Sequence, residues 1–271
     1  MATVKHYHNH YRFSYNTSLK RHFSSVILVI LFLIFIFLSI FHFLAPQQSF
    51  NLNEISYADI FYASLGTLFR LSAAYAISLF VAIPLALFIT SSPKVEKIFL
   101  PISDVIQSVP ILAFFPMIVL VFVRFKFFDG AAIFILFMSM LWNIVFTIIG
   151  GLKTIPEDVN YATKIFKAKG FKKLWFVILP SVFPSIITGS FLAWGQGWNI
   201  SIVAEALHNY IPNGKVSDDL YGLGSLLVNS FSQGKTVVFF ASLVTMIIII
   251  SLLNFFVWQK LLHLSERFKF D

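Results

Sequence analysis

The 271-residue chain contains no cysteine, which excludes disulfide bonds, thiolate metal sites and thiol nucleophiles. Charge is scarce too: Asp, Glu, Lys and Arg make up 12% of the residues, whereas a soluble domain carries about 25%. Hydrophobic residues account for 58%, and phenylalanine alone occurs 34 times. Because so few charges cannot cover a surface in water, we expect lipid to be the solvent for much of the chain.

Reactive motifs are missing as well. The sequence has no Gly-rich phosphate loop ending in Lys-Ser/Thr, no His-Glu-x-x-His helix, and no intramembrane carboxylate pair or Ser-His pair. His42 and His208 are solitary in the sequence. We therefore predict a protein that is not an enzyme and that has no catalytic residue, cofactor or metal site.

Six apolar runs approach the length of about 20 residues that crosses a hydrocarbon layer roughly 30 Å thick. The first lacks a small-residue cleavage site and is interpreted as an anchor rather than a signal peptide. We therefore predict an all-α membrane protein with six transmembrane helices, at residues 23–44, 71–89, 98–123, 131–149, 182–206 and 236–258.

Lysine and arginine determine the predicted orientation, since cytoplasmic loops carry an excess of both. With the N-terminus inside, fifteen of these residues fall in cytoplasmic segments, four fall outside, and Arg70 lies at the outer end of the second run. Both termini are thus predicted to be cytoplasmic. This orientation accounts for the net charge of +8, and no nucleic-acid partner is expected.

The most informative segment is the loop between the fourth and fifth runs. Thr154 and Glu157 fit a capping box, which predicts the start of a short helix. Gly170 fits the stop of that helix, and a second short helix is predicted after it. Both helices fit either a pair lying on anionic headgroups or a docking surface for a protein. Their apolar faces consist of Tyr161, Ala162, Ile165 and Phe166, then Phe171, Leu174, Trp175 and Ile178.

Residues 161–180 resemble the cytoplasmic coupling loop of ABC importer permeases, in the branch serving nitrate, sulfonate and taurine-type substrates. In that family the loop runs Glu-Ala-Ala, three residues, Gly, nine residues, Ile, one residue, Leu-Pro. Alignment on Leu179 and Pro180 puts Ala162 at the first Ala. It puts Tyr161 at the Glu and Lys167 at the Gly, so the loop is divergent. Similar sequence continues through Gly197-Trp198-Asn199 and Ile202-Val203-Ala204-Glu205.

This resemblance implies the type I importer permease fold in the plasma membrane. It implies a permease domain at 64–258 with a coupling loop at 150–180, and cytoplasmic tails at 1–22 and 259–271. The implied partners are a cytoplasmic ABC ATPase dimer, which hydrolyses the ATP, a second permease copy, identical or different, and an extracytoplasmic substrate-binding protein. The residues expected to meet the ATPase are Glu157, Tyr161, Ala162, Ile165, Phe166, Gly170, Trp175, Leu179 and Pro180.

Polar residues within the apolar runs are candidates for a translocation pathway, because unpaired polar groups facing lipid are unfavourable. Hydrogen bonding between helices is the alternative role. Glu205 matches the end of the family's Val-Ala-Glu and is expected to gate or to support the structure. Arg70 is expected either to attract anions in an outer vestibule or to snorkel to the interface. The pathway candidates are Gln107, Asn143, Thr188, Gln196 and Asn199.

The sequence thus predicts the permease subunit of an ABC importer for a small solute, an anion such as nitrate, a sulfonate or taurine. The alternative is a secondary transporter or channel with no ATPase partner, although neither explains the amphipathic loop. The sequence leaves the substrate and the composition of the permease pair open.

Overall fold

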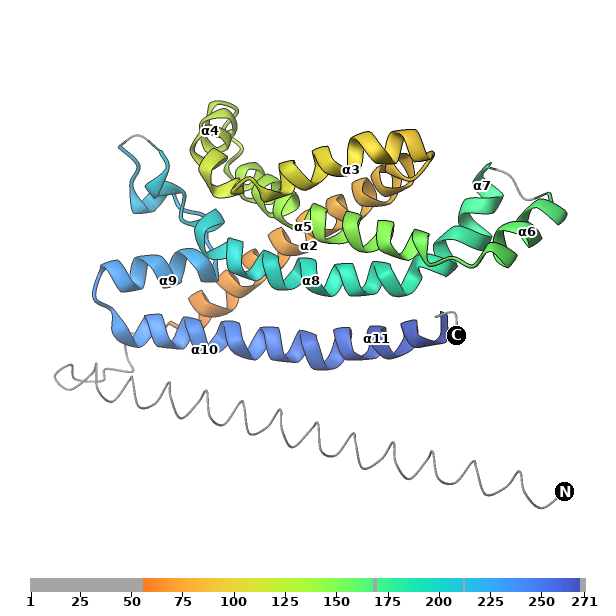
Figure 1. Cartoon of the computed structure of the whole chain (residues 1–271). Helices are drawn as coiled ribbons and strands as arrows, with labels where there is room; N and C mark the ends of the chain where they lie inside the picture. The colour runs from red at the N-terminus through yellow and green to blue at the C-terminus, as the bar shows by residue number, and fades with distance from the viewer. Residues whose placement is uncertain (1–55, 168–169, 212, 269–271) are drawn as a thin grey trace, which may run out of the picture. The chain divides into compact units, whose positions relative to one another are not determined.

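The structure, a computed structural model, describes residues 56–167, 170–211 and 213–268. The predicted tail at 1–22 and the predicted first transmembrane helix at 23–44 lie outside the described residues. All regular secondary structure in the described ranges is helical, as predicted (Figure 1). Four of the described helical segments are long and apolar enough to cross a membrane, and a bent pair of helices brings the number to five.

Three helices form the centre of the bundle: α2 (Tyr57–Ile89), α5 (Phe128–Lys153) and α8 (Leu179–Glu205). Helix α5 packs against both of the others and carries much of the buried core. Its inner face repeats every three to four residues, as expected for a helix that packs on both sides. The fully or nearly fully buried side chains on that face are Ile135, Leu136, Met140, Ile144 and Ile148.

A small residue lets α5 and α8 approach closely. A Cβ atom added at Gly189 would lie 3.0 Å from the Cα atom of Ile144 and 3.2 Å from the carbonyl oxygen of Asn143. Small residues at such crossings allow close van der Waals packing in lipid. At Gly195, by contrast, nothing in the described chain lies within 4 Å of a Cβ atom built there. Gly195 therefore lies on an open face of α8.

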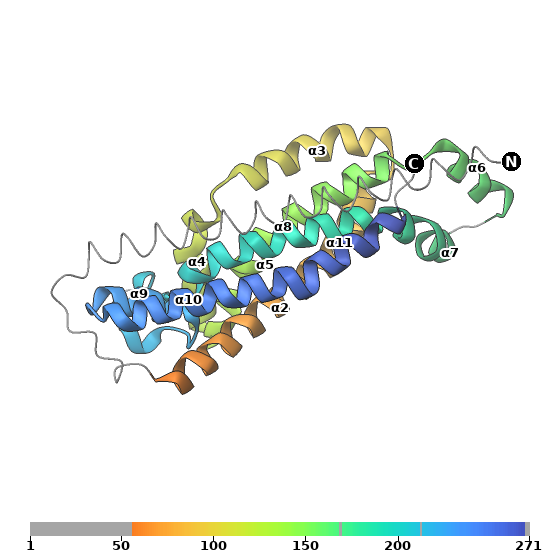
Figure 2. The same cartoon turned by 90° about the horizontal axis from the view of Figure 1, so that it is seen from below.

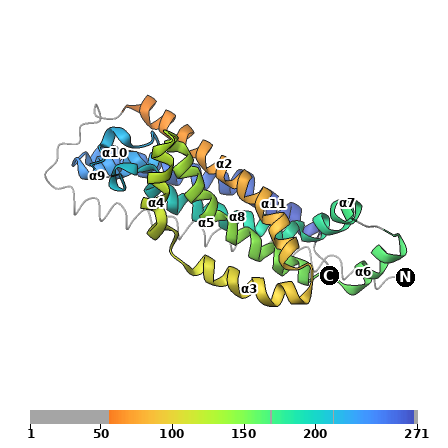
Figure 3. The same cartoon turned by 90° about the horizontal axis from the view of Figure 1, so that it is seen from above.

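The predicted span at 98–123 is not one helix. It forms α3 (Pro93–Ser108) and α4 (Ile111–Arg124), whose axes differ in direction by 81°. The break falls at Val109, which is extended with φ −73° and ψ 126°, followed by Pro110. Proline has no N–H to donate and disfavours the helical region for the residue before it. Helix α3 lies at the edge of the bundle (Figures 1 and 3), and Ser103 is its one buried residue.

The predicted spans at 71–89, 131–149, 182–206 and 236–258 lie in described helices that are long and apolar enough to cross a membrane, with shifted ends. Helix α2 begins at Tyr57, capped by the Ser56 hydroxyl, rather than near residue 71. The predicted apolar run began only after Arg70 because arginine is charged, but the folded protein buries this residue. The sixth run becomes α10 (Thr236–Leu253), a π-helical turn (Asn254–Trp258) and α11 (Gln259–Ser265), which packs against α8.

The short helices gather at two opposite ends of the bundle (Figures 1 and 2). One end, here the α6 end, carries α6 (Glu157–Ile165) and α7 (Gly170–Lys173). The other, the α9 end, carries α9 (Leu223–Ser232) and the loop that precedes it. Helix α7 runs through a π-helical turn (Leu174–Ile178) directly into α8. The segment Gly170–Glu205 is therefore one continuous helix of 36 residues.

Candidate functional site

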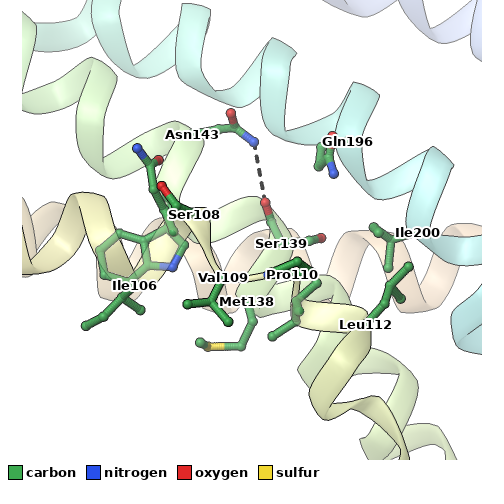
Figure 4. A pocket seen from close by; sticks show the side chains of 13 residues that line it. Ile106, Ser108, Val109, Pro110, Leu112, Met138, Ser139, Asn143, Gln196 and Ile200 are labelled. Carbon is green, nitrogen blue, oxygen red and sulfur yellow. Dashed lines mark hydrogen bonds between the residues drawn. The ribbon is translucent and has the colours of Figure 1, made fainter.

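A pocket of about 400 Å³ lies where α5 and α8 face the break between α3 and α4 (Figure 4). Three of the five predicted pathway residues line it, one from each of three helices: Gln107 from α3, Asn143 from α5 and Gln196 from α8. Ser108 and Ser139 add hydroxyl groups. All of the lining residues are uncharged, so the pocket presents amides and hydroxyls against an otherwise apolar wall.

The hydrogen bonds of the pocket leave amide groups available to a solute. The Asn143 Nδ2 atom donates to the Ser139 carbonyl over a long 3.4 Å, and the Ser139 hydroxyl donates to its own helix at 2.8 Å. Gln107 is held by Asp104, whose Oδ1 atom accepts from Gln107 Nε2 at 2.8 Å. The Gln196 amide makes no hydrogen bond to any residue that the structure describes. It can therefore donate to and accept from a bound solute.

The two remaining pathway candidates lie outside this pocket. Thr188 lines a second pocket nearer the α6 end, and Asn199 is exposed, with its Nδ2 atom donating to the Gly195 carbonyl at 3.2 Å. Both nevertheless share one exposed face of α8, at helical spacing, with Gln196. Polar groups on a membrane helix face water or protein rather than lipid. The complete exposed stripe is Thr188, Leu192, Gly195, Gln196 and Asn199.

At the α9 end, a buried ion pair joins segments that are distant in sequence. The Arg70 Nη1 atom donates to Glu205 Oε1 at 2.9 Å and to the Tyr221 carbonyl at 3.2 Å. Its Nε atom donates to Asp129 Oδ1 at 2.6 Å. The Arg70 side chain is 7% exposed and the Glu205 side chain 0%, whereas Asp129 is half-exposed. Arg70 thus connects α2, the start of α5, the end of α8 and the loop before α9.

The second oxygen of Glu205 is also fully engaged. Its Oε2 atom accepts from the Thr67 hydroxyl at 3.1 Å and from the Gly224 N–H at 2.8 Å. A side chain at Gly224 would collide with α8, since its Cβ atom would lie 2.6 Å from the Ser201 carbonyl oxygen. The expectation that Arg70 snorkels or attracts anions is therefore wrong. Sequence reasoning missed Thr67 and Gly224 as partners of Glu205 and Asp129 as a partner of Arg70, although an apolar run interrupted by an arginine signals a buried counter-charge.

A second buried carboxylate, that of Asp219, also forms polar contacts at the α9 end. Asp219, whose side chain is 4% exposed, lies 2.8 Å from His208 Nδ1 and accepts from the Asn229 Nδ2 atom at 2.8 Å. The Tyr221 hydroxyl donates to Asp59 Oδ1 at 2.9 Å, and partial burial together with this carboxylate raises the pKa of the phenol. The loop between α8 and α9 is therefore fixed to α2 and α9 by polar contacts.

At the α6 end, the first predicted short helix is present as α6, whereas the second is the start of the continuous helix Gly170–Glu205. Leu174 and Ile178 are half-buried, and the larger apolar side chains of the loop are exposed. Ile165 and Phe166 are 76% and 81% exposed, and Phe171 stacks on Trp175 with ring centroids 6.0 Å apart. Tyr161 is exposed as well. Glu157 is the first residue of α6, and Leu179 and Pro180 open α8. The side chain of Ala162 lies outside the part of the chain that the structure describes.

Two details of this loop differ from the prediction. Thr154 ends α5 rather than capping α6, because its hydroxyl donates to the Gly151 carbonyl at 2.9 Å. Helix α6 stops at Ile165, earlier than a stop at Gly170 would allow. Both Lys167 and Gly170 have left-handed backbone conformations, with φ of +52° and +53°.

The family model for the binding-protein-dependent transport system inner membrane component matches residues 78–267. The chain belongs to this family. The nitrate import permease protein NrtB of Leptolyngbya laminosa is 29% identical over 61% of the chain and 58% of its own length. The bicarbonate transport system permease protein CmpB of Synechocystis sp. is 28% identical over 64% and 58%. The taurine transport system permease protein TauC of Escherichia coli is 28% identical over 52% and 50%. The matches thus span about half of these relatives, and the predicted resemblance is confirmed.

In this inner membrane component, Lys167 has a left-handed backbone conformation. The alignment on Leu179 and Pro180 placed Lys167 at the glycine of the coupling motif that the loop resembles. A left-handed conformation is accessible to glycine without strain but costs about 1 kcal/mol for a residue with a Cβ atom. The lysine at this position is therefore strained where a glycine would not be.

We expect Lys167→Gly to relieve this strain and to strengthen binding of a loop partner by up to about fivefold, the equivalent of about 1 kcal/mol. The matched control is Lys167→Ala, which removes the same charged side chain but keeps the Cβ atom. Affinity of the cognate ATPase for the detergent-solubilised chain measures the effect. Equal affinities for the two variants would show that the backbone conformation at residue 167 carries no strain.

Proposed function

We propose that this chain is the permease subunit of an ABC importer, and that the stripe on α8 and the pocket beside it form its translocation pathway. The observation that carries the proposal is the single helix Gly170–Glu205. It begins in the exposed apolar loop and bears Gln196 in the pocket. Trp175 and Gln196 are separated by about 30 Å of helix, at about 1.5 Å per residue. Because one continuous helix joins the loop to Gln196, a movement of the loop would displace the wall of the pocket.

The proposed topology has six transmembrane helices with both termini cytoplasmic. The predicted helix at 23–44 supplies one, the bent pair α3–α4 supplies another, and the four long helices supply the rest. The α6 end is then cytoplasmic and the α9 end extracytoplasmic, in agreement with the lysine-rich loop between α5 and α8. The proposed location of the protein is the plasma membrane. The proposed permease domain spans residues 64–258, with the coupling loop at 150–180.

The proposed partners follow from surfaces that the described chain leaves uncovered. Ile165, Phe166 and Trp175 present apolar groups on the cytoplasmic side, which suits a groove on an ATPase dimer. The ATPase would hydrolyse the ATP, because the sequence has no phosphate loop. The exposed polar stripe on α8 and the exposed face of α3 suit a second permease copy, identical or different. An extracytoplasmic binding protein would meet the α9 end.

The solute proposed is a small anion or a related polar molecule such as nitrate, bicarbonate, a sulfonate or taurine. The relatives named for nitrate, bicarbonate and taurine support this range. A pocket of amides and hydroxyls with no basic side chain fits a solute of low net charge, because a multiply charged anion would lack a counter-charge there. Selection among these solutes would rest mainly with the binding protein.

The pathway is tested by replacing the free amide of the pocket. In proteoliposomes with the ATPase and the binding protein, Gln196→Leu should lower ATP-dependent uptake by about tenfold or more, since it removes the solute's partner and leaves an apolar surface. The matched control is Thr245→Val, which removes a hydroxyl bonded within α10 and remote from the pocket. Equal uptake by both variants would argue against this pathway. ATP-independent uptake by the chain alone would favour a secondary transporter or channel.

A further inference from the structure

The second pocket lies between α5 and α8 at the α6 end and has a volume of about 500 Å³. Its wall is rich in hydroxyls: Thr147 and Thr154 from α5, and Ser181, Ser185 and Thr188 from α8. Among the described residues, Phe268 is the only aromatic one that lines it, and it comes from the short 3₁₀ segment Glu266–Phe268 after α11. A ring from the far end of the described chain thus forms part of the wall of a polar cavity between two core helices.

This pocket continues the line of the first one. On α5, Asn143 of the first pocket is followed at helical spacing by Thr147 of the second, and the Thr147 hydroxyl donates to the Asn143 carbonyl at 2.8 Å. On α8, Gln196 and Thr188 lie on the same exposed stripe, about 12 Å apart at about 1.5 Å per residue. The polar residues of the two pockets therefore follow one another along the same faces of α5 and α8, toward the α6 end.

Phe268 is held at this position by a contact that can open. Its ring meets Phe183 of α8 edge to face, with centroids 5.1 Å apart, and it remains 42% exposed. The helix that leads to it is anchored by Trp258, which is 7% exposed and packs against Tyr75 and Trp194. Helix α11 stays packed against α8 up to Ser265, which is 2% exposed. A rotation of the Phe268 side chain would therefore take the ring out of the pocket without disturbing the buried contacts before it.

The Phe268 ring rests on α8, which is the helix that a movement of the coupling loop would displace. Phe183 lies four residues after Leu179, at the start of α8, which continues the helix of the coupling loop. A displacement of that loop shifts Phe183 and hence the surface on which Phe268 rests. We propose that Phe268 is the cytoplasmic gate residue of the pathway, covering the second pocket and withdrawing when the coupling loop moves. The gating role rests on the proposed permease function, whereas coverage of the pocket does not.

The natural absence of cysteine permits a direct test. A single Ser185→Cys substitution places a thiol in the second pocket, and a membrane-impermeant maleimide is applied to the cytoplasmic face of the assembled complex in inside-out vesicles. We expect Phe268→Ala to raise the labelling rate about tenfold, because it removes the covering ring. Phe268→Trp, which keeps a ring, should leave the rate unchanged, as should Phe255→Ala, a control at an exposed ring that lies outside the pocket wall.

If the labelling rate of Ser185→Cys differs by less than about twofold with and without Phe268→Ala, Phe268 does not act as a gate. The uptake of fully labelled Ser185→Cys in proteoliposomes gives a separate readout. Blocked uptake supports a pathway through this pocket. Full uptake after complete labelling would refute the pathway of the proposed function, and with it the gate, even if Phe268→Ala had exposed the thiol.

Discussion

Replacing Arg70 by methionine is expected to lower the free energy of unfolding by about 3–5 kcal/mol, because Glu205 would remain buried without its counter-charge. The Glu205 carboxylate would keep only the Thr67 hydroxyl and the Gly224 N–H. The measurement is the unfolding midpoint of the detergent-solubilised chain in a denaturant series. Asp129→Asn, which removes the half-exposed partner, serves as the matched control and should cost less than about 1 kcal/mol.

The double variant Arg70→Met/Glu205→Gln separates the ion pair from the packing around it. It should be more stable than Arg70→Met alone, since the unpaired buried charge is gone. Equal instability of the two would mean that Arg70 acts through its alkyl chain rather than through its charge. Glu205→Gln alone tests gating: lower uptake at an unchanged unfolding midpoint supports a gate, whereas a parallel loss of both indicates a structural role.

The second large effect is expected at the coupling loop. Phe166→Asp combined with Trp175→Asp should abolish co-purification of the cognate ATPase, because two charges would enter an apolar interface centred on aromatic residues. An interface that loses two aromatic anchors weakens by about 4 kcal/mol or more, roughly a thousandfold in dissociation constant. ATP-dependent uptake should be lost with it.

The matched control for this loop is Lys173→Asp. It adds a carboxylate to the same short helix but at helical spacing away from Phe171 and Trp175, so ATPase binding should largely persist. If the aromatic double variant still retains the ATPase, the exposed side chains contact lipid headgroups instead. Binding of the isolated chain to vesicles of anionic lipid would then fall in the aromatic double variant.

The sequence predicts those parts of the fold that depend on local pattern. Apolar runs located α5, α8 and α10 because a membrane-spanning helix needs uninterrupted apolar length. The same criterion misplaced the start of α2, since it treats every arginine as solvated. Arg70 is compatible with a buried helix only because Glu205 and Asp129 reach it, and those contacts depend on the tertiary structure. The 81° bend at Pro110 could not be predicted from the sequence either, because prolines also occur within continuous helices such as α2.

The candidate site shows the same division. Spacing along single helices singled out Asn143 and Gln196, and the structure brings both to one pocket, while their part in a pathway stays a prediction. Nothing in the sequence indicated that Phe268 lines this pocket, because the hydroxyls around its ring lie 80 or more residues earlier in the chain. The strain at Lys167 became visible only when the family motif and the backbone angle were compared.

The Arg70–Glu205 contact also has a consequence for biosynthesis. The two residues are separated by 135 positions, so Arg70 leaves the ribosome long before its counter-charge exists. At about 5–20 residues per second, the delay is roughly 7–27 s. An unpaired arginine within a membrane helix costs about 2.5–3.5 kcal/mol on translocon scales, which favours holding the N-terminal turns of α2 at the interface during that interval. The helix that begins the described bundle would thus be among the last to reach its final depth.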